Sequence, residues 1–395
     1  MSTQKIAIAE LLASPDQTLK AAREAGAVAD TEIGPLIVRH AAVRAIGQSD
    51  KLRPAFSRLL QRFGVSSGPF HDWMSGSPLD MEGEQHRVWR QLMMRAFTPR
   101  SVDRLRPFLA EHTNQLVDAM LPLGTCDFVD AFARRLPSAG LCELMGVPHE
   151  DRTRFSVWAD TIGLGFNLVM LPTKIAEIDA ALMQLLAYAD ELIAARRASP
   201  RDDLVTRIAQ AVDETKGMDE NVIRGSVAGL VFAGHETTKN QLGWMIAILA
   251  EAPHEWDRVA HEPERARDVV EEVLRFRSTA TSFGRLALED LELFGERIPA
   301  GTSVVASIWS ANRDASEFEK PDTFAVDENR GGVQLAFGQG AHHCLGAALA
   351  RAELQEALIA LSRRMHCPKL EPGSQWLPPI GINGPTFLPI SYAAR

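Results

Sequence analysis

The sequence predicts a mainly α fold with a small β-rich region. Residues 101–215 are mostly helical in pattern, with apolar side chains near helical spacing over residues 101–121. Residues 221–250 form a strongly apolar stretch without proline, long enough for a helix of about 45 Å. Strand-like pieces are short, and they gather in three segments, near residues 35–60, 279–308 and 376–392.

The composition limits the class of protein. Of the 395 residues, 46% are hydrophobic, which is ample for a large packed core. The net charge of −9 argues against a nucleic-acid partner. The four cysteines form no CxxC pair, and the N-terminus contains neither a signal-like apolar segment nor a membrane-spanning stretch. We therefore expect a soluble, cytoplasmic protein with no membrane partner.

The N-terminal part combines short elements with one expected long loop. Residues 1–60 mix short helical runs with a strand-like piece, and residues 64–78 are rich in Gly, Ser and Pro, which is typical of a loop. A helix is expected over residues 84–97. His86 and Arg90 are four residues apart there and share one face. By themselves they fit a solvated helix face.

Two further helical segments have ordinary explanations. Residues 155–171 are apolar and interrupted by glycines, which core packing explains. In the helix expected over residues 266–277, Glu272 and Arg275 have the spacing of a surface ion pair worth ~0.3 kcal/mol. The E-x-x-R spacing selects Glu272 rather than Glu271 as the partner of this arginine.

The middle of the apolar helix over residues 221–250 contains residues that a helix interior disfavours. Gly234 costs ~1 kcal/mol relative to alanine, and Thr237 can bond back to the carbonyl of Ala233 and bend the helix. Glu236 needs a partner or a cavity in such apolar surroundings. A long core helix with a tolerated kink is the plain interpretation.

A glycine-rich loop over residues 337–346 precedes a helical run over residues 347–355. Gly338 and Gly340 permit positive φ and close approach of the backbone to a flat ligand. Cys344 therefore lies at a helix N-terminus, where the helix dipole is expected to lower the thiol pKa and stabilise a thiolate. A buried cysteine beside an ordinary turn is the alternative for a lone cysteine.

The loop and three other motifs resemble one family. Residues 337–346 match every specified position of F-G-x-G-x-H-x-C-x-G, and this resembles the haem-thiolate loop of cytochromes P450. Residues 233–238 resemble the oxygen-binding helix motif of that family. Shorter matches are H-x-x-x-R over residues 86–90 and E-x-x-R over residues 272–275. The resemblance covers about residues 80–360 in the correct order.

This resemblance implies a P450-like fold, with many helices around a buried haem in a single domain over residues 1–395. Cys344 would be the axial ligand of the haem iron. Thr237 would bond the dioxygen and Glu236 would feed protons to it, while Glu272 and Arg275 would form a structural ion pair behind the haem. Propionate-binding residues would be His86, Arg90, Arg285 and His342, and further cofactor-binding residues would be Ala233, Gly234, Phe337, Gly338 and Gly346.

The activity implied by the resemblance is that of a haem b monooxygenase. Such an enzyme would insert one oxygen atom from O2 into a hydrophobic small molecule, most simply by C–H hydroxylation. Peroxide-driven peroxygenation, and epoxidation or oxidative coupling on the same haem, are alternatives, and a non-enzymatic haem sensor is a third. Family members that use peroxide directly tend to lose the acid–alcohol pair, so Glu236 and Thr237 favour monooxygenation.

The resemblance also implies partners. The sequence contains neither a flavin domain nor iron–sulfur cysteines, so electrons would come from a separate ferredoxin and its reductase. Basic residues expected on the cysteine side of the molecule, where an acidic ferredoxin would bind, are Arg95, Arg100, Arg104 and Arg351. Candidate substrate contacts are Phe70, Trp73, Phe166, Val231, Phe283 and Phe387.

Overall fold

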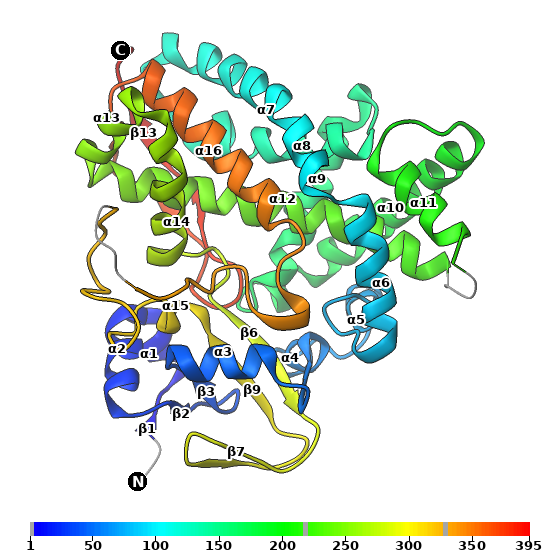
Figure 1. Ribbon diagram of the computed structural model, residues 1–395, viewed down its shortest axis with the longest axis vertical. Helices are drawn as coiled ribbons and strands as arrows, with labels where there is room; N and C mark the ends of the chain where they lie inside the picture. Colours follow the sequence, from blue (N-terminus) through cyan, green and yellow to red (C-terminus); the bar gives the residue numbers. More distant parts are fainter. Residues whose placement is uncertain (1–3, 216–219, 327–330) are drawn as a thin grey trace.

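The computed structural model describes residues 4–215, 220–326 and 331–395, and helices dominate it (Figure 1). This confirms the prediction of a mainly α fold. The α-helices are α1 (Ile8–Ala13), α2 (Pro15–Ala25), α3 (His40–Gln48), α4 (Phe56–Arg62), α5 (Pro69–Ser75), α6 (Gly83–Ala96), α7 (Pro99–Met120), α8 (Arg135–Met145), α9 (Arg152–Gly163), α10 (Leu171–Ala198), α11 (Leu204–Asp213), α12 (Glu220–Ala250), α13 (Pro253–His261), α14 (Ala266–Phe276), α15 (Ile308–Ala311) and α16 (Ala347–Arg364).

The largest sheet in the described ranges is mixed and six-stranded, with the order β1-β2-β3-β9-β6-β4, and it lies at the bottom of Figure 1. Antiparallel β6 and β9 form its longest pairing, with Phe283 opposite Ala306. The strands are β1 (Gln4–Lys5), β2 (Val28–Asp30), β3 (Leu36–Ile37), β4 (Leu52–Pro54), β5 (Thr125–Asp127), β6 (Ser282–Ala287), β7 (Leu291–Leu293), β8 (Glu296–Ile298), β9 (Ser303–Ser307), β10 (Lys369–Leu370), β11 (Gln375–Trp376), β12 (Pro385–Phe387) and β13 (Pro389–Ser391).

Helix α12 crosses the helical part of the molecule and organises its packing (Figure 1). It contacts α8, α9, α10 and α16, and α16 packs in turn along α7. Its apolar side chains join one large core, in which Val227, Val231 and Leu242 are almost completely buried. Burial of this kind stabilises the fold by roughly 25 cal/mol for each Å² of apolar surface removed from water.

A smaller core lies where α3 and α15 cover the sheet. Ile37 from β3 and Val304 from β9 meet Val43 and Ile46 from α3 there. Alternating positions on the strands supply these residues, as expected for a sheet with one covered face. The sheet, α3 and α15 thus support the segment that leads into the thiol loop.

The segment over residues 64–78 is not wholly a loop, so this sequence expectation is wrong in part. Pro69 begins the short helix α5, because proline suits the first position of a helix. The carboxylate of Asp179 on α10 accepts a hydrogen bond from the backbone N–H of Phe70 at 2.8 Å. A distant side chain therefore satisfies the helix start, and local composition cannot reveal such a partner.

None of the helices in the described ranges is long and apolar enough to cross a membrane.

Candidate functional site

A cavity of about 420 Å³ lies between α12, the thiol loop, α6 and β6. The structure brings together residues that are more than 250 positions apart in the sequence. Thr237 lines this cavity, and so do all ten sequence-predicted cofactor-binding residues: His86, Arg90, Ala233, Gly234, Arg285, Phe337, Gly338, His342, Cys344 and Gly346.

The thiol loop needs its glycines. Gly338 and Gly340 have φ of 69° and 73°, a region that disfavours other residues. A Cβ at Gly340 would also collide with the backbone carbonyl of Gly47 at the end of α3. The loop closes through the backbone N–H of Cys344, which donates to the carbonyl of Phe337 at 2.9 Å. This closure points the Cys344 thiol at the cavity.

Cys344 is exposed and lines the cavity, while the protein on its other sides desolvates the thiol. Burial raises its pKa, although the Gly346 backbone N–H and the charges of Arg90 and Arg351 act in the opposite direction. The sequence-based expectation of a lowered pKa is therefore wrong for the thiol in this structure, because desolvation outweighs the helix start. A coordinated metal cation would deprotonate the thiol outright.

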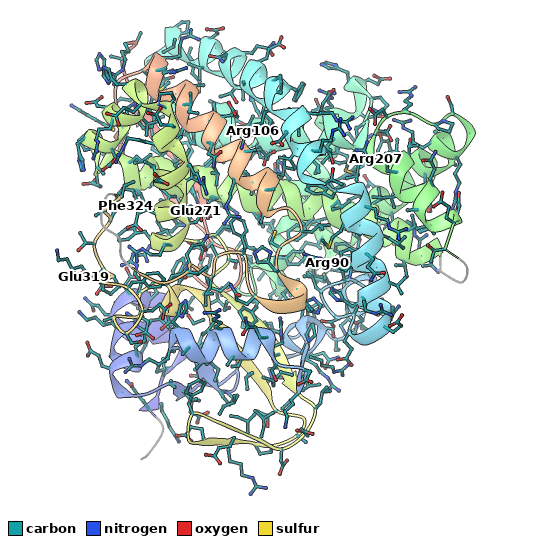
Figure 2. All side chains as sticks on the ribbon, in the orientation of Figure 1. Arg90, Arg106, Arg207, Glu271, Glu319 and Phe324 are labelled. Carbon is teal, nitrogen blue, oxygen red and sulfur yellow. The ribbon has the colours of Figure 1, made fainter. Side chains whose placement is uncertain are left out.

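Four basic side chains gather at one edge of the cavity. Arg90 projects from α6 (Figure 2) and Arg285 from β6, and neither forms an ion pair within the described ranges. The rings of His86 and His342 stack with centroids 3.9 Å apart. Burial lowers the pKa of Arg285 to about 10, and burial with the neighbouring positive charges lowers that of His342 to about 3.

The guanidinium groups of Arg90 and Arg285 are cations without an ion-pair partner in the described ranges, so they favour an anionic ligand, whereas the two histidines, whose pKa values are lowered, are neutral at pH 7. A haem fits this site, because its two carboxylates would meet the basic cluster while its iron faced Cys344. Gly234, on the α12 wall of the cavity, has no side chain, and a Cβ there would lie 3.2 Å from the Leu141 side chain, which also lines the cavity. Cys344 would hold the iron, and Arg90, Arg285, His86 and His342 would hold the carboxylates.

The acid and the alcohol of α12 point in different directions. The Thr237 hydroxyl lines the cavity and donates to the Ala233 carbonyl at 2.7 Å, the back-bond that the sequence suggested. The Glu236 carboxylate lies on another side of the helix, against α9. It fits there because Gly163 has no side chain; a Cβ would lie 2.7 Å from its carboxyl carbon.

An ionic network holds Glu236 in that position. Its carboxylate accepts hydrogen bonds from Lys239 at 2.5 Å and from Asn240 at 2.8 Å. Lys239 also donates to Asp160 on α9, which interacts with His235 as well. Asp160, His235 and Glu236 are close enough together to suggest a metal site, but the ammonium group of Lys239 already joins the two carboxylates.

Three of the six candidate substrate contacts line the cavity, namely Trp73, Phe166 and Phe283. The other three lie elsewhere. Phe70 is buried with its ring against Gly165, and Val231 is buried in the core on another face of α12. Phe387 is 39% exposed on β12. Ile382, from the same C-terminal segment, lines the cavity instead.

The E-x-x-R residues form a buried ion pair near the site. Nε and Nη2 of Arg275 donate hydrogen bonds to the two carboxylate oxygens of Glu272, at 2.7 and 2.8 Å. Glu271 pairs instead with Arg351, whose guanidinium lies 4.4 Å from the ring of Phe337. The E-x-x-R spacing therefore predicted the correct glutamate partner of Arg275.

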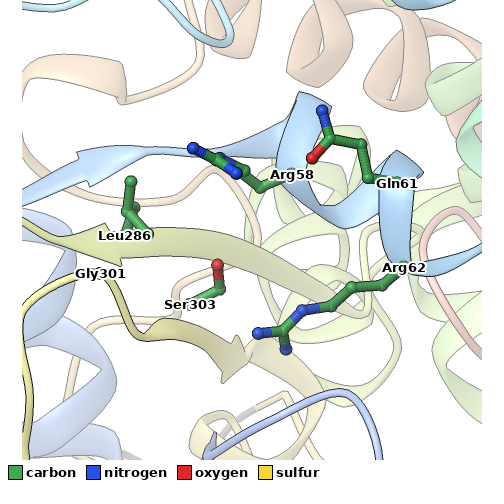
Figure 3. A pocket seen from close by; sticks show the side chains of 6 residues that line it. All are labelled: Arg58, Gln61, Arg62, Leu286, Gly301 and Ser303. Atoms are coloured by element: carbon green, nitrogen blue, oxygen red, sulfur yellow. The ribbon is translucent and has the colours of Figure 1, made fainter. Parts of the chain in front are cut away.

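A second cavity, of about 300 Å³, opens between α4 and strands β6 and β9 (Figure 3). It contains neither a thiol nor an acid, so it lacks the groups from which the first cavity is built. Its lining residues are Arg58, Gln61, Arg62, Leu286, Gly301 and Ser303.

Sequence reasoning missed several residues of the first cavity, above all Glu353. This residue lies on α16, nine positions after Cys344, and only 1% of its surface is exposed. No motif marked it, because Glu is common on amphipathic helices. The single available signal was an acid at helical spacing from Leu349, in a helix that begins at the thiol loop.

The geometry of the site indicates a class of protein. In the described part of the chain, a single cysteine faces a largely apolar cavity, and Arg90 and Arg285, which form no ion pair there, line its edge. Such a site suits a haem that is bound through a cysteine sulfur.

Comparisons with known proteins agree. A family model described as Cytochrome P450 matches residues 158–368. The luteothin monooxygenase of Streptomyces thioluteus is 34% identical over 94% of this chain and 92% of its own length. The mycinamicin IV hydroxylase/epoxidase of Micromonospora griseorubida is 37% identical over 81% of each chain. A solved cytochrome P450 of Chondromyces apiculatus has a TM-score of 0.89 at 28% identity and covers 99% of both chains.

The chain therefore belongs to the cytochrome P450 family. It is a haem-thiolate monooxygenase that uses haem and O2 and acts on small molecules with the help of redox partners.

Proposed function

We propose that this enzyme hydroxylates a C–H bond of an uncharged, hydrophobic small molecule in the cytoplasm, with haem b as cofactor. The proposal rests on the apolar wall of the cavity, beyond the basic side chains of Arg90, Arg285, His86 and His342. Aromatic and aliphatic side chains form that wall: Trp73, Phe166, Leu230, Phe232, Phe283 and Ile382. The names of relatives include a hydroxylase, an epoxidase and an N-oxygenase, so they do not select one substrate.

The residue roles belong to the same proposal. Haem, when bound, would supply the activation of O2 and the insertion of one oxygen atom. Cys344 would hold the haem iron and donate electron density to it, and Arg90, Arg285, His86 and His342 would hold the haem by its carboxylates. The remaining cofactor-binding residues shape the surface against which the ring packs.

Thr237 is proposed to orient oxygen and to exclude loose water from its surroundings. Glu236 is proposed to assist it as an acid, but the Glu236 carboxylate would first have to leave Lys239, since it lies off the cavity.

Replacing Thr237 by alanine tests this role. We expect oxygen and electron consumption to continue, while product per electron falls by about tenfold to a hundredfold. The measurement uses a substrate found through its effect on the haem spin-state spectrum. Thr161→Ala on α9 is the matched control, because the Thr161 hydroxyl makes the same back-bond, to Val157 at 2.9 Å. Unchanged product per electron in Thr237→Ala would exclude the proposed role.

We also propose that electrons come from an acidic ferredoxin. Among the four arginines that the sequence suggested, Arg95 and Arg100 are exposed and form no ion pair within the described ranges. Arg104 pairs with Asp202 at 3.4 Å, and Arg351 is held by Glu271. Arg95 and Arg100, near the junction of α6 and α7, are therefore the cations available to a partner.

The variant Arg95→Glu with Arg100→Glu should reduce the rate of haem reduction by a ferredoxin about tenfold at low salt. It should also flatten the dependence of that rate on salt. The pair Arg58→Glu with Arg62→Glu, on α4 beside the second cavity, changes the net charge equally and serves as the control. Equal rates in both double variants would place the docking surface elsewhere.

A further inference from the structure

A half-buried ion pair next to the thiol loop joins two helices that are far apart in the sequence. Nε and Nη2 of Arg351 on α16 donate hydrogen bonds to the two carboxylate oxygens of Glu271 on α14 (Figure 2). Glu271 is not the glutamate of the E-x-x-R motif, and Arg351 follows the thiol-loop motif. Neither motif therefore explains why these two charges are paired here.

The pair contacts the start of the thiol loop in two ways. The guanidinium carbon of Arg351 lies 4.4 Å from the centroid of the Phe337 ring, which is the distance of a cation–π contact. The Glu271 carboxylate also accepts a hydrogen bond from Gln334 at 3.1 Å. Gln334 in turn accepts one from the backbone N–H of Ala336 at 2.7 Å. The ion pair thus holds both the backbone that enters the loop and the first aromatic ring of the loop.

Phe337 connects this pair with the cysteine. Its side chain lines the haem cavity, and its backbone carbonyl accepts the hydrogen bond from the N–H of Cys344 at 2.9 Å. Arg351 lies about two helical turns after Cys344, in the helix that follows the loop. One charge of the pair therefore rests on a ring that is bonded, through one backbone hydrogen bond, to the residue that carries the thiol.

We propose that Arg351 and Glu271 set how strongly Cys344 donates electron density to the haem iron, a proposal that rests on the proposed axial role of the cysteine. The positive charge of Arg351 attracts the electron density of the thiolate, and this favours the reduced haem. The negative charge of Glu271 offsets this effect and keeps Arg351 on the Phe337 ring. Both are positioning residues, because they act through the loop and do not touch the reacting atoms.

The signs of two opposite substitutions test the proposal. Glu271→Gln leaves the charge of Arg351 unbalanced, so the haem reduction potential should rise, and the ratio of reduced to oxidised haem at a fixed potential should increase about threefold to tenfold. Arg351→Gln leaves Glu271 unbalanced and should lower this ratio by a similar factor. The double variant should return close to the wild-type value. Spectroelectrochemical titration of the haem-loaded protein measures all three.

A pair with only a structural role would give a different pattern. Each variant would then loosen the loop, so all potentials would shift in one direction and the double variant would shift most. Arg351→Lys keeps the charge but not the paired hydrogen bonds, and its potential should stay nearer to wild type than that of Arg351→Gln. Because the two side chains are 31% and 35% exposed, added salt should weaken the shifts without abolishing them.

Glu356→Gln is the matched control. Glu356 is also on α16, but it pairs at 2.9 Å with Arg106 on α7 and not with the residue on the loop. Its replacement removes one negative charge, as Glu271→Gln does, and should leave the haem potential unchanged. A shift equal to that of Glu271→Gln would mean that the net charge of the molecule, and not the pair beside Phe337, sets the potential, and would overturn the proposal.

The carbon monoxide spectrum of the reduced protein is a second measurement that needs no turnover. The thiolate band should persist in every variant, and it should move in opposite directions in Glu271→Gln and Arg351→Gln. A wild-type protein without this band would contradict the axial role of the cysteine and the present proposal together. An intact wild-type band, with both single variants unshifted or shifted in the same direction, would overturn the present proposal alone. If Arg351→Gln loses its haem, an unchanged potential in Glu271→Gln suffices to overturn it.

Discussion

The variant Cys344→Ser should lose product formation to the level of the reaction without enzyme. Serine can occupy the same place in the loop, but its hydroxyl is a poor ligand for haem iron, and it cannot donate electron density as a thiolate does. The carbon monoxide spectrum of the reduced protein should no longer show thiolate ligation. Product formation and this spectrum are measured on protein reconstituted with haem.

Cys367→Ser is the matched control. Cys367 is half-buried, lies outside the cavity, and its thiol donates to the carbonyl of Leu249 at 3.3 Å. A serine hydroxyl can make the same bond, so spectrum and activity should be unchanged. A thiolate spectrum that persisted in Cys344→Ser would mean that another cysteine ligates the iron.

The thiol loop was predictable because its chemistry is local. The glycines that allow positive φ and the cysteine at the helix start lie within ten residues, so sequence spacing alone places them together. The cations Arg90 and Arg285 are almost 200 residues apart. They could be assigned to the same site only because the resemblance to one known family gave each of them a role there.

The directions of individual side chains were not predictable. The Glu236 carboxylate is turned away from the cavity by Lys239 on its own helix and by the space above Gly163 on α9. The burial of Glu353 depends on how α7, α8 and α12 pack around it. Neither effect leaves a signal at fixed sequence spacing, because both arise from contacts between separate elements.

The second large effect concerns stability. Glu272→Ala should reduce the free energy of unfolding by about 3–5 kcal/mol. Arg275 is 4% exposed, so removing its partner leaves a buried positive charge without a counterion. Urea unfolding of the haem-loaded protein, followed by tryptophan fluorescence, measures the change. Glu272→Gln should cost less, because its amide oxygen can still accept a hydrogen bond from Arg275.

The exposed pair of Arg297 and Asp290 provides the control. Its side chains are 79% and 56% exposed and form an ion pair at 2.8 Å, so Arg297→Ala should cost only about 0–1 kcal/mol. If Glu272→Ala cost no more than Arg297→Ala, the buried pair would contribute nothing beyond a surface contact.

Removing both charges should not restore the stability, because Arg275 has further partners. Its guanidinium donates to three backbone carbonyls, those of Asn312, Pro321 and Thr323, at 2.8 to 3.0 Å. The Glu272 carboxylate accepts from the backbone N–H of Ala325 at 3.0 Å. The double variant Glu272→Ala with Arg275→Ala would leave these groups unsatisfied.

The ion pair is bonded to backbone groups between Asn312 and Ala325, in the segment that leads toward the thiol loop. If this segment lost its order, the position of Cys344 would change as well. We therefore expect haem retention to fall in parallel with stability across these variants. A variant that lost stability but kept its haem would show that the loop is held independently of the ion pair.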